Sequence, residues 1–114
     1  VIDTLDHMEK LLHKHLIESD PKGRTSMAEA FGGYGKAFDR AEAEMIDVRE
    51  SLVKPIRDVL GKNIILIVHS QKIKTTDPFM AIEYETNEMT LHKKVIPVWK
   101  DWVSGVFFAD FVKY

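Results

Sequence analysis

Apolar residues recur every three or four positions in two stretches of the chain, which is the spacing of one face of a helix. The first stretch predicts an amphipathic helix over residues 5–18, with Glu9 on its polar face. The second predicts a long helix over residues 38–59. Pro55 interrupts it, because proline inside a helix removes a hydrogen bond and costs about 3 kcal/mol. We therefore expect a kink or a restart at Pro55 and an end at Gly61.

Shorter apolar segments predict strands. Residues 63–68 contain a continuous, mostly β-branched run, which is typical of a parallel strand buried on both faces. Residues 1–3 indicate the end of another buried strand, and residues 106–109 predict a third. Alternating apolar and acidic residues over 80–85 predict a half-exposed strand, whereas the polar residues 72–79 predict a loop.

A short helix is expected to begin near Lys93, with Trp99 and Trp102 on its core face. Pro97 fits this helix only in its first turn, and Gly105 ends it. Helices that alternate with parallel strands predict an α/β fold, with a mainly parallel sheet flanked by helices.

The composition of the chain excludes several kinds of site and partner. The 114 residues, 45% of them hydrophobic, suit one domain or part of one, and the net charge of −2 gives no global field for nucleic acid or an anionic membrane. There is no cysteine, which excludes thiolate zinc sites and cysteine nucleophiles and is compatible with a reducing cytoplasm. The longest apolar run is far short of the about 20 residues that span a bilayer, so we expect a soluble protein with no membrane partner.

The two ends of the chain have the composition of a domain interior. The chain begins without Met inside a predicted strand, and it closes directly after the apolar run over residues 106–111. Domain boundaries are more often polar or rich in glycine and proline, so we expect both ends to cut through a domain.

Asp3 is the first candidate for chemistry. An acid at the carboxyl end of a buried parallel strand lies where α/β folds bind ligands, and its oxygens suit Mg²⁺. Asp3 is equally suited to cap the helix that follows, with Thr4 beside it. Its spacing from Asp6, with two residues between, excludes the haloacid dehalogenase and topoisomerase-primase patterns.

Two further segments could contact phosphate. His69, Ser70 and Gln71 follow the strand at residues 63–68, where polar side chains can sense a γ-phosphate or its attacking water; alternatively they are ordinary turn residues. Lys93 and Lys94 lie near a helix start, where paired lysines favour a bound anion; alternatively they form a solvated basic patch.

Four segments in order resemble the phage-type AAA family of nucleotide-binding proteins, a RecA-related group. They are VIDTLDHMEKLL, FGGYGKAF, NIILIVHSQ and LHKKVIPVWKDWVSGVFFADF. The resemblance implies a RecA-like P-loop NTPase core truncated at its N-terminus, in which residues 1–114 run from the Walker B strand onward. The phosphate-loop pattern G-x-x-x-x-G-K-[ST] does not occur in the sequence, so we expect no hydrolysis by this chain alone.

The resemblance also implies roles for individual residues. Asp3 corresponds to the Walker B aspartate that holds Mg²⁺, His69 to Gln71 form the sensor segment, and Lys93 or Lys94 reaches a phosphate at a subunit boundary. It further implies ATP as ligand, a homo-oligomer on single-stranded DNA, and a DNA-dependent ATPase of phage recombination or replication in the cytoplasm of a bacterial host. A non-enzymatic interaction scaffold and a nucleotide-binding switch without turnover stay open as alternatives.

Overall fold

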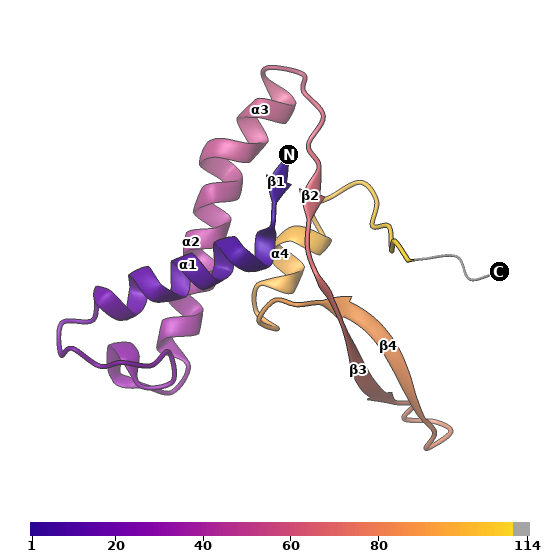
Figure 1. Cartoon of the computed structure of the whole chain (residues 1–114), viewed down its shortest axis with the longest axis horizontal. Coiled ribbons are helices and arrows are strands. Elements are labelled where there is room, and N and C mark those ends of the chain that lie inside the picture. Colours follow the sequence, from indigo (N-terminus) through magenta and orange to yellow (C-terminus); the bar gives the residue numbers. More distant parts are fainter. Residues whose placement is uncertain (111–114) are drawn as a thin grey trace.

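The computed structural model describes residues 1–110 of the chain. Short strands alternate with helices, and a two-stranded hairpin projects from the rest of the molecule (Figure 1). In chain order the elements are β1 (Ile2–Asp3), α1 (Leu5–Glu18), the 3-10 turn η1 (Ala30–Gly32), α2 (Lys36–Val48), the π-helical turn η2 (Arg49–Val53), α3 (Lys54–Asp58), β2 (Leu66–Ile67), β3 (Ser70–Thr76), β4 (Glu83–Met89) and α4 (Ile96–Lys100).

Helix α1 has the bounds that the apolar spacing predicts. Thr4 caps its first turn, since the Thr4 hydroxyl accepts a hydrogen bond from the backbone N–H of His7 at 3.2 Å. The prediction that Glu9 lies on the polar face of this helix is wrong, because its side chain is buried. Glu9 lies four residues after Leu5 and seven before Leu16, in one apolar row of the helix.

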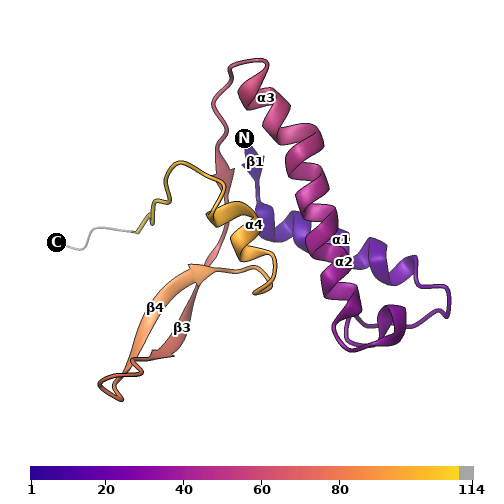
Figure 2. The ribbon, with the colours of Figure 1, turned by 180° about the vertical axis from the view of Figure 1, so that it is seen from behind.

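The long helix is interrupted next to Pro55, as predicted. Helices α2 and α3 follow one another through the π-helical turn η2, and Pro55 is the second residue of α3, which begins at Lys54. The helical backbone is continuous there, so the change to a π-helical turn directly before Pro55 is the interruption that its missing N–H predicts. Together they form one rod that crosses α1 (Figure 2). α3 ends at Asp58, and the chain turns through Gly61, whose φ of 63° is readily adopted only without a side chain.

The parallel sheet consists of one pair of strands within residues 1–110. β1 and β2 are parallel, with Ile2 opposite Leu66 and Asp3 opposite Ile67. The strand predicted over residues 63–68 is therefore present but much shorter, because only two of its residues have a ladder partner. The mixed α/β class is confirmed, and the extended RecA-like sheet stays a prediction.

The hairpin corrects the loop predicted over residues 72–79. β3 pairs antiparallel with β4 over seven residues, from Ser70 opposite Met89 to Thr76 opposite Glu83. Most side chains on both faces of this arm are exposed, so the strand lacks the apolar alternation that marks a strand with one buried face. Asp77 closes the turn by accepting hydrogen bonds from the backbone N–H groups of Phe79 and Met80.

The end of the described chain also departs from expectation. α4 carries Pro97 in its first turn, as predicted, but residues 106–109 form no strand, and Phe107 is 95% exposed. Residues 106–109 lie near β2, since both line one pocket, but no strand within residues 1–110 forms a ladder with them. Phe111, the last apolar residue of the run, lies outside the described residues.

Two clusters of buried side chains connect the helices. The larger joins α1, the α2–α3 rod and α4, and Arg49 ties the rod to α4 through a 2.8 Å hydrogen bond to the carbonyl of Val98. Its buried members are Leu5, Met45, Val53, Leu91, Val95, Val98 and Trp99. The smaller cluster comprises Leu16, Met27, Ala30, Ala37 and Ala41. None of the helices within residues 1–110 has the length and apolar character that crossing a bilayer requires.

Leu5→Ala is expected to destabilise the fold by about 2–5 kcal/mol, because Leu5 is 1% exposed and its loss leaves a cavity against Trp99. Leu11→Ala removes the same atoms from the same helix where the side chain is 56% exposed, and should change stability by less than about 0.5 kcal/mol. Urea unfolding followed by circular dichroism measures both. Equal losses would contradict this assignment of the core.

Candidate functional site

The carboxyl edge of the β1–β2 pair brings together the first predicted site residues. Asp3 is the last residue of β1 and is exposed, and its register partner in β2 is Ile67. His69 comes two residues after Ile67, so Asp3 and His69 both lie at the carboxyl ends of this parallel strand pair. The carboxyl edge of parallel strands is the usual ligand-binding side of such a sheet.

Asp3 does not cap the following helix. Thr4 does so instead, and the peptide bond that joins the two residues is cis. Within residues 1–110 the Asp3 carboxylate takes part in no hydrogen bond or ion pair. Of the two interpretations of Asp3, the cap is therefore wrong, and the carboxylate is available to a ligand.

Asp6 holds His69 by two hydrogen bonds. The backbone N–H of His69 donates to Oδ1 of Asp6 at 3.1 Å, and Nδ1 of the His69 ring lies 2.8 Å from Oδ2. The side chain of Asp6 is buried, whereas that of His69 is 75% exposed. The ring is thus anchored on one side and open to solvent on the other.

These contacts change the acidity of Asp6. Burial alone would raise its pKa, but hydrogen bonds from the backbone and ring of His69, with a smaller one from Thr4, lower the pKa to about 2. Asp6 is therefore a carboxylate at neutral pH. A carboxylate only accepts hydrogen bonds, so the atom of His69 that faces it must carry a proton.

Glu9 makes a parallel contact one turn further along α1. The backbone N–H of His92 donates to both of its carboxylate oxygens at 3.1 Å, which ties the segment after β4 to the same helix. Burial raises the pKa of Glu9, the negative charge of Asp6 raises it further, and the bond from His92 lowers it. Asp6 and Glu9 thus join the segments after β2 and β4 to α1.

The ring of His92 packs on Phe38 of α2, with centroids 4.0 Å apart and planes 8° from parallel. His13 meets the same phenyl ring edge-on at 5.8 Å. Burial lowers the pKa of both histidines; for His92, the charges of Lys93 and Lys94 add to this effect. These rings therefore favour the neutral form and serve as packing groups.

Ser70 and Gln71 do not stay with His69 at the strand edge. Both belong to β3, and the side-chain amide of Gln71 donates to the carbonyl of Met89 across the hairpin at 3.3 Å. The three predicted sensor residues are consecutive in the chain, but among them His69 alone is hydrogen-bonded to α1, through Asp6. Their catalytic role stays a prediction.

Lys94 lies against α2, where its ammonium group contacts the carboxylate of Asp39. Lys93 is exposed in the turn before α4. The two lysines therefore differ in their surroundings, and Lys93 is the one whose charge is directed to solvent. Phosphate binding by either stays a prediction.

The donor set at the strand edge suits Mg²⁺ better than a transition metal. Within the described part of the chain, no three His, Cys, Asp or Glu side chains gather as a metal cage. Mg²⁺ keeps several water ligands and is commonly held by one or two carboxylates together with nucleotide phosphates. A single exposed carboxylate such as Asp3 meets that requirement.

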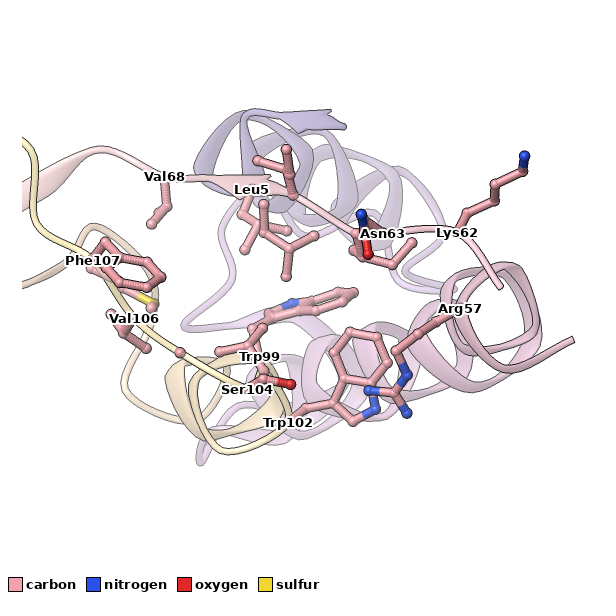
Figure 3. A pocket seen from close by; sticks show the side chains of 16 residues that line it. Leu5, Arg57, Lys62, Asn63, Val68, Trp99, Trp102, Ser104, Val106 and Phe107 are labelled. Atoms are coloured by element: carbon pink, nitrogen blue, oxygen red, sulfur yellow. The ribbon is translucent and has the colours of Figure 1, made fainter. Parts of the chain in front are cut away.

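A separate cavity of about 590 Å³ lies between β2, α4 and residues 103–107 (Figure 3). Trp99 and Trp102 form part of one wall, and the guanidinium of Arg57 covers the Trp102 ring at 4.2 Å. Asp3 and His69 do not line it. Its lining is mostly apolar, and the strand-edge site is a different part of the molecule.

Comparison with known families decides the class of protein. A family described as an AAA domain matches residues 1–114. The chain belongs to this AAA domain family. No curated protein and no solved structure matches the chain. Membership in an AAA-type P-loop family indicates nucleotide binding and ATPase activity.

The sequence indicates Asp3 and His69 as site residues and does not single out Asp6 and Glu9, and the roles of Asp3 and His69 stay predictions. Glu9 gave a signal, because an acid in the apolar row of Leu5 and Leu16 needs a buried partner. Asp6 lies beside Leu5 and was considered only as part of a two-aspartate pattern. Its partner lies 63 residues away, which local spacing does not reveal.

The depressed pKa of Asp6 predicts a loss of stability in acid. Its folded-state value of about 2 lies below the ordinary 3.8, so its carboxylate stabilises the fold above about pH 4 by about 2 kcal/mol, and this contribution disappears as the pH falls from about 4 to about 2. Urea unfolding of wild type and Asp6→Asn at pH 7 and pH 3 tests this. The difference between the two proteins should shrink at pH 3, and a constant difference would contradict the prediction.

Proposed function

We propose that this AAA domain holds Mg²⁺–ATP at the carboxyl edge of β1 and β2, with Asp3 as the carboxylate that binds the metal. The observation that carries the proposal is the exposed Asp3 carboxylate, which has no hydrogen bond or ion pair within residues 1–110 and is not the helix cap. When bound, Mg²⁺ would neutralise charge on the β- and γ-phosphates.

His69 is the proposed sensor residue, because it follows β2 at the same edge and exposes most of its ring. Ser70 is the first residue of β3, so a displacement of His69 would act directly on the hairpin. Lys93 is the proposed contact to a phosphate at a subunit boundary, since its side chain is exposed. Lys94 would have to leave Asp39 to take this role.

The proposed biological setting is an oligomeric, DNA-dependent ATPase of phage recombination or replication in the host cytoplasm, in line with the four segments that resemble the phage-type, RecA-like family. The β3–β4 arm is the local surface that suits single-stranded DNA. It exposes Phe79 at its tip, and stacking of bases on aromatic rings is one way in which such strands are bound. Lys72 and Lys74 lie on β3, but Lys74 stands opposite Glu85 and the arm carries more acids than lysines, so the aromatic ring is the proposed contact.

Asp3→Asn should abolish the Mg²⁺ dependence of ATP binding, because an amide oxygen keeps the shape of the side chain but loses the charge that the cation needs. ATP binding by the protein is measured by titration calorimetry with Mg²⁺ and with EDTA. Glu18→Gln is the matched control, since it removes an exposed carboxylate from the end of α1. Equal Mg²⁺ dependence in wild type and Asp3→Asn would rule out Asp3 as the metal-binding acid.

Phe79→Ala should weaken binding of a fluorescent oligothymidine about 5- to 150-fold, because stacking of one base on an aromatic ring contributes about 1–3 kcal/mol. Phe107→Ala is the control, since Phe107 is as exposed as Phe79 but lies in the segment after α4. Fluorescence anisotropy at fixed ionic strength measures both variants. Identical affinities of Phe79→Ala and wild type would exclude the tip of the arm as a DNA contact.

A non-enzymatic scaffold is the second candidate, and the exposed apolar tip of the β3–β4 arm favours it. Phe79 is 96% exposed and Met80 67%, as expected of residues that dock a protein partner. Absence of nucleotide binding by the protein would support the scaffold. A nucleotide-binding switch would instead bind Mg²⁺–ATP tightly and release no phosphate.

A further inference from the structure

Asp6 constrains His69 more than a single hydrogen bond would. One carboxylate oxygen accepts from the backbone N–H at 3.1 Å and the other lies 2.8 Å from Nδ1, so the residue is held at two points by one buried group. The 75% exposure of the side chain means that the rest of the ring, with Nε2, is accessible from solvent.

The contact also decides which ring nitrogen carries the proton. An ionised carboxylate accepts hydrogen bonds only, so the neutral ring must place its proton on Nδ1, facing Asp6. Nε2 then bears a lone pair. A lone pair accepts a hydrogen bond from water, but it cannot donate one to a phosphate oxygen, which is itself an acceptor.

We propose that Asp6 is a positioning residue that holds His69 in the Nδ1–H form, so that Nε2 accepts a hydrogen bond from a water molecule at the strand edge shared with Asp3. The part that concerns turnover rests on the proposed function, because that water would be the one oriented toward the γ-phosphate. On this proposal His69 orients a water molecule and does not contact the phosphate directly.

Asp6→Asn tests the proposal without removing the side chain. The backbone N–H of His69 still requires the remaining oxygen, which turns the amide nitrogen toward Nδ1. An amide nitrogen donates, so Nδ1 must become the acceptor and the proton must move to Nε2. The substitution therefore reverses the tautomer while leaving the shape of the contact in place.

Glu9→Gln is the matched control. It changes a second buried carboxylate of α1 that likewise accepts from a distant backbone N–H, but its partner is His92 and it does not touch the His69 ring. Any general loosening of α1 should appear in both variants, whereas a tautomer change at His69 should appear only in Asp6→Asn.

The first readout is NMR of this chain with ¹⁵N-labelled histidine at pH 7.5, in which ring nitrogen and carbon-bound proton correlations distinguish the tautomers. The His69 signals are those that disappear in His69→Gln. Wild type and Glu9→Gln should show the Nδ1–H form, and Asp6→Asn the Nε2–H form. A wild-type Nε2–H form or a rapidly averaged ring overturns the proposal, whether or not Asp6→Asn folds well enough for study.

The second readout is steady-state ATP hydrolysis by the protein. Asp6→Asn should lower kcat about 10- to 100-fold with KM nearly unchanged, as is typical when a group that orients a functional side chain is lost. Unchanged kcat with a reversed tautomer would overturn the role in turnover. If the proposed function itself is wrong, neither the wild-type protein nor Asp3→Asn will bind ATP. The NMR result would still show whether Asp6 determines the tautomer of the His69 ring.

Discussion

The paired carboxylates on α1 are the constraint on which the arrangement of this domain depends. Asp6 and Glu9 lie on a buried face of the helix, and each accepts hydrogen bonds from a chain segment more than 60 residues away. A buried carboxylate is costly to desolvate, so these two groups are compatible with the fold only when His69 and His92 occupy their places. This requirement fixes the ends of β2 and β4 relative to α1.

One helix thereby connects the strand edge to the rest of the molecule. Asp3 is joined to α1 through its cap residue Thr4, and Asp6 in the first turn of α1 accepts a hydrogen bond from His69. Both candidate ligand residues are therefore positioned by the first turn of the same helix. Glu9 extends the connection to the turn before α4, whose Trp99 packs beside Leu5 in the core. The site residues thus rest on the best-packed part of the domain.

Local patterns predicted the elements that depend on local chemistry. α1 follows from the spacing of its leucines, Pro97 lies in the first turn of α4 where a missing N–H costs least, and Pro55 coincides with a π-helical interruption of the long helix. β3 was predicted to be a loop because a strand exposed on both faces has no apolar alternation. The tie between Asp6 and His69 depends on tertiary packing across 63 residues, and so spacing rules could identify each residue but not the pair.

The outer edge of β2 has a consequence for the behaviour of the chain in solution. Within residues 1–110 this edge has no strand beside it, and its two residues, Leu66 and Ile67, include neither the lysine nor the proline that usually blunts such an edge. Exposed apolar edges act as templates for pairing between molecules, and a net charge of −2 adds little repulsion. Covering this edge, by another strand or by a second molecule, therefore contributes to the colloidal stability of the chain, to an extent set by the two-residue length of β2.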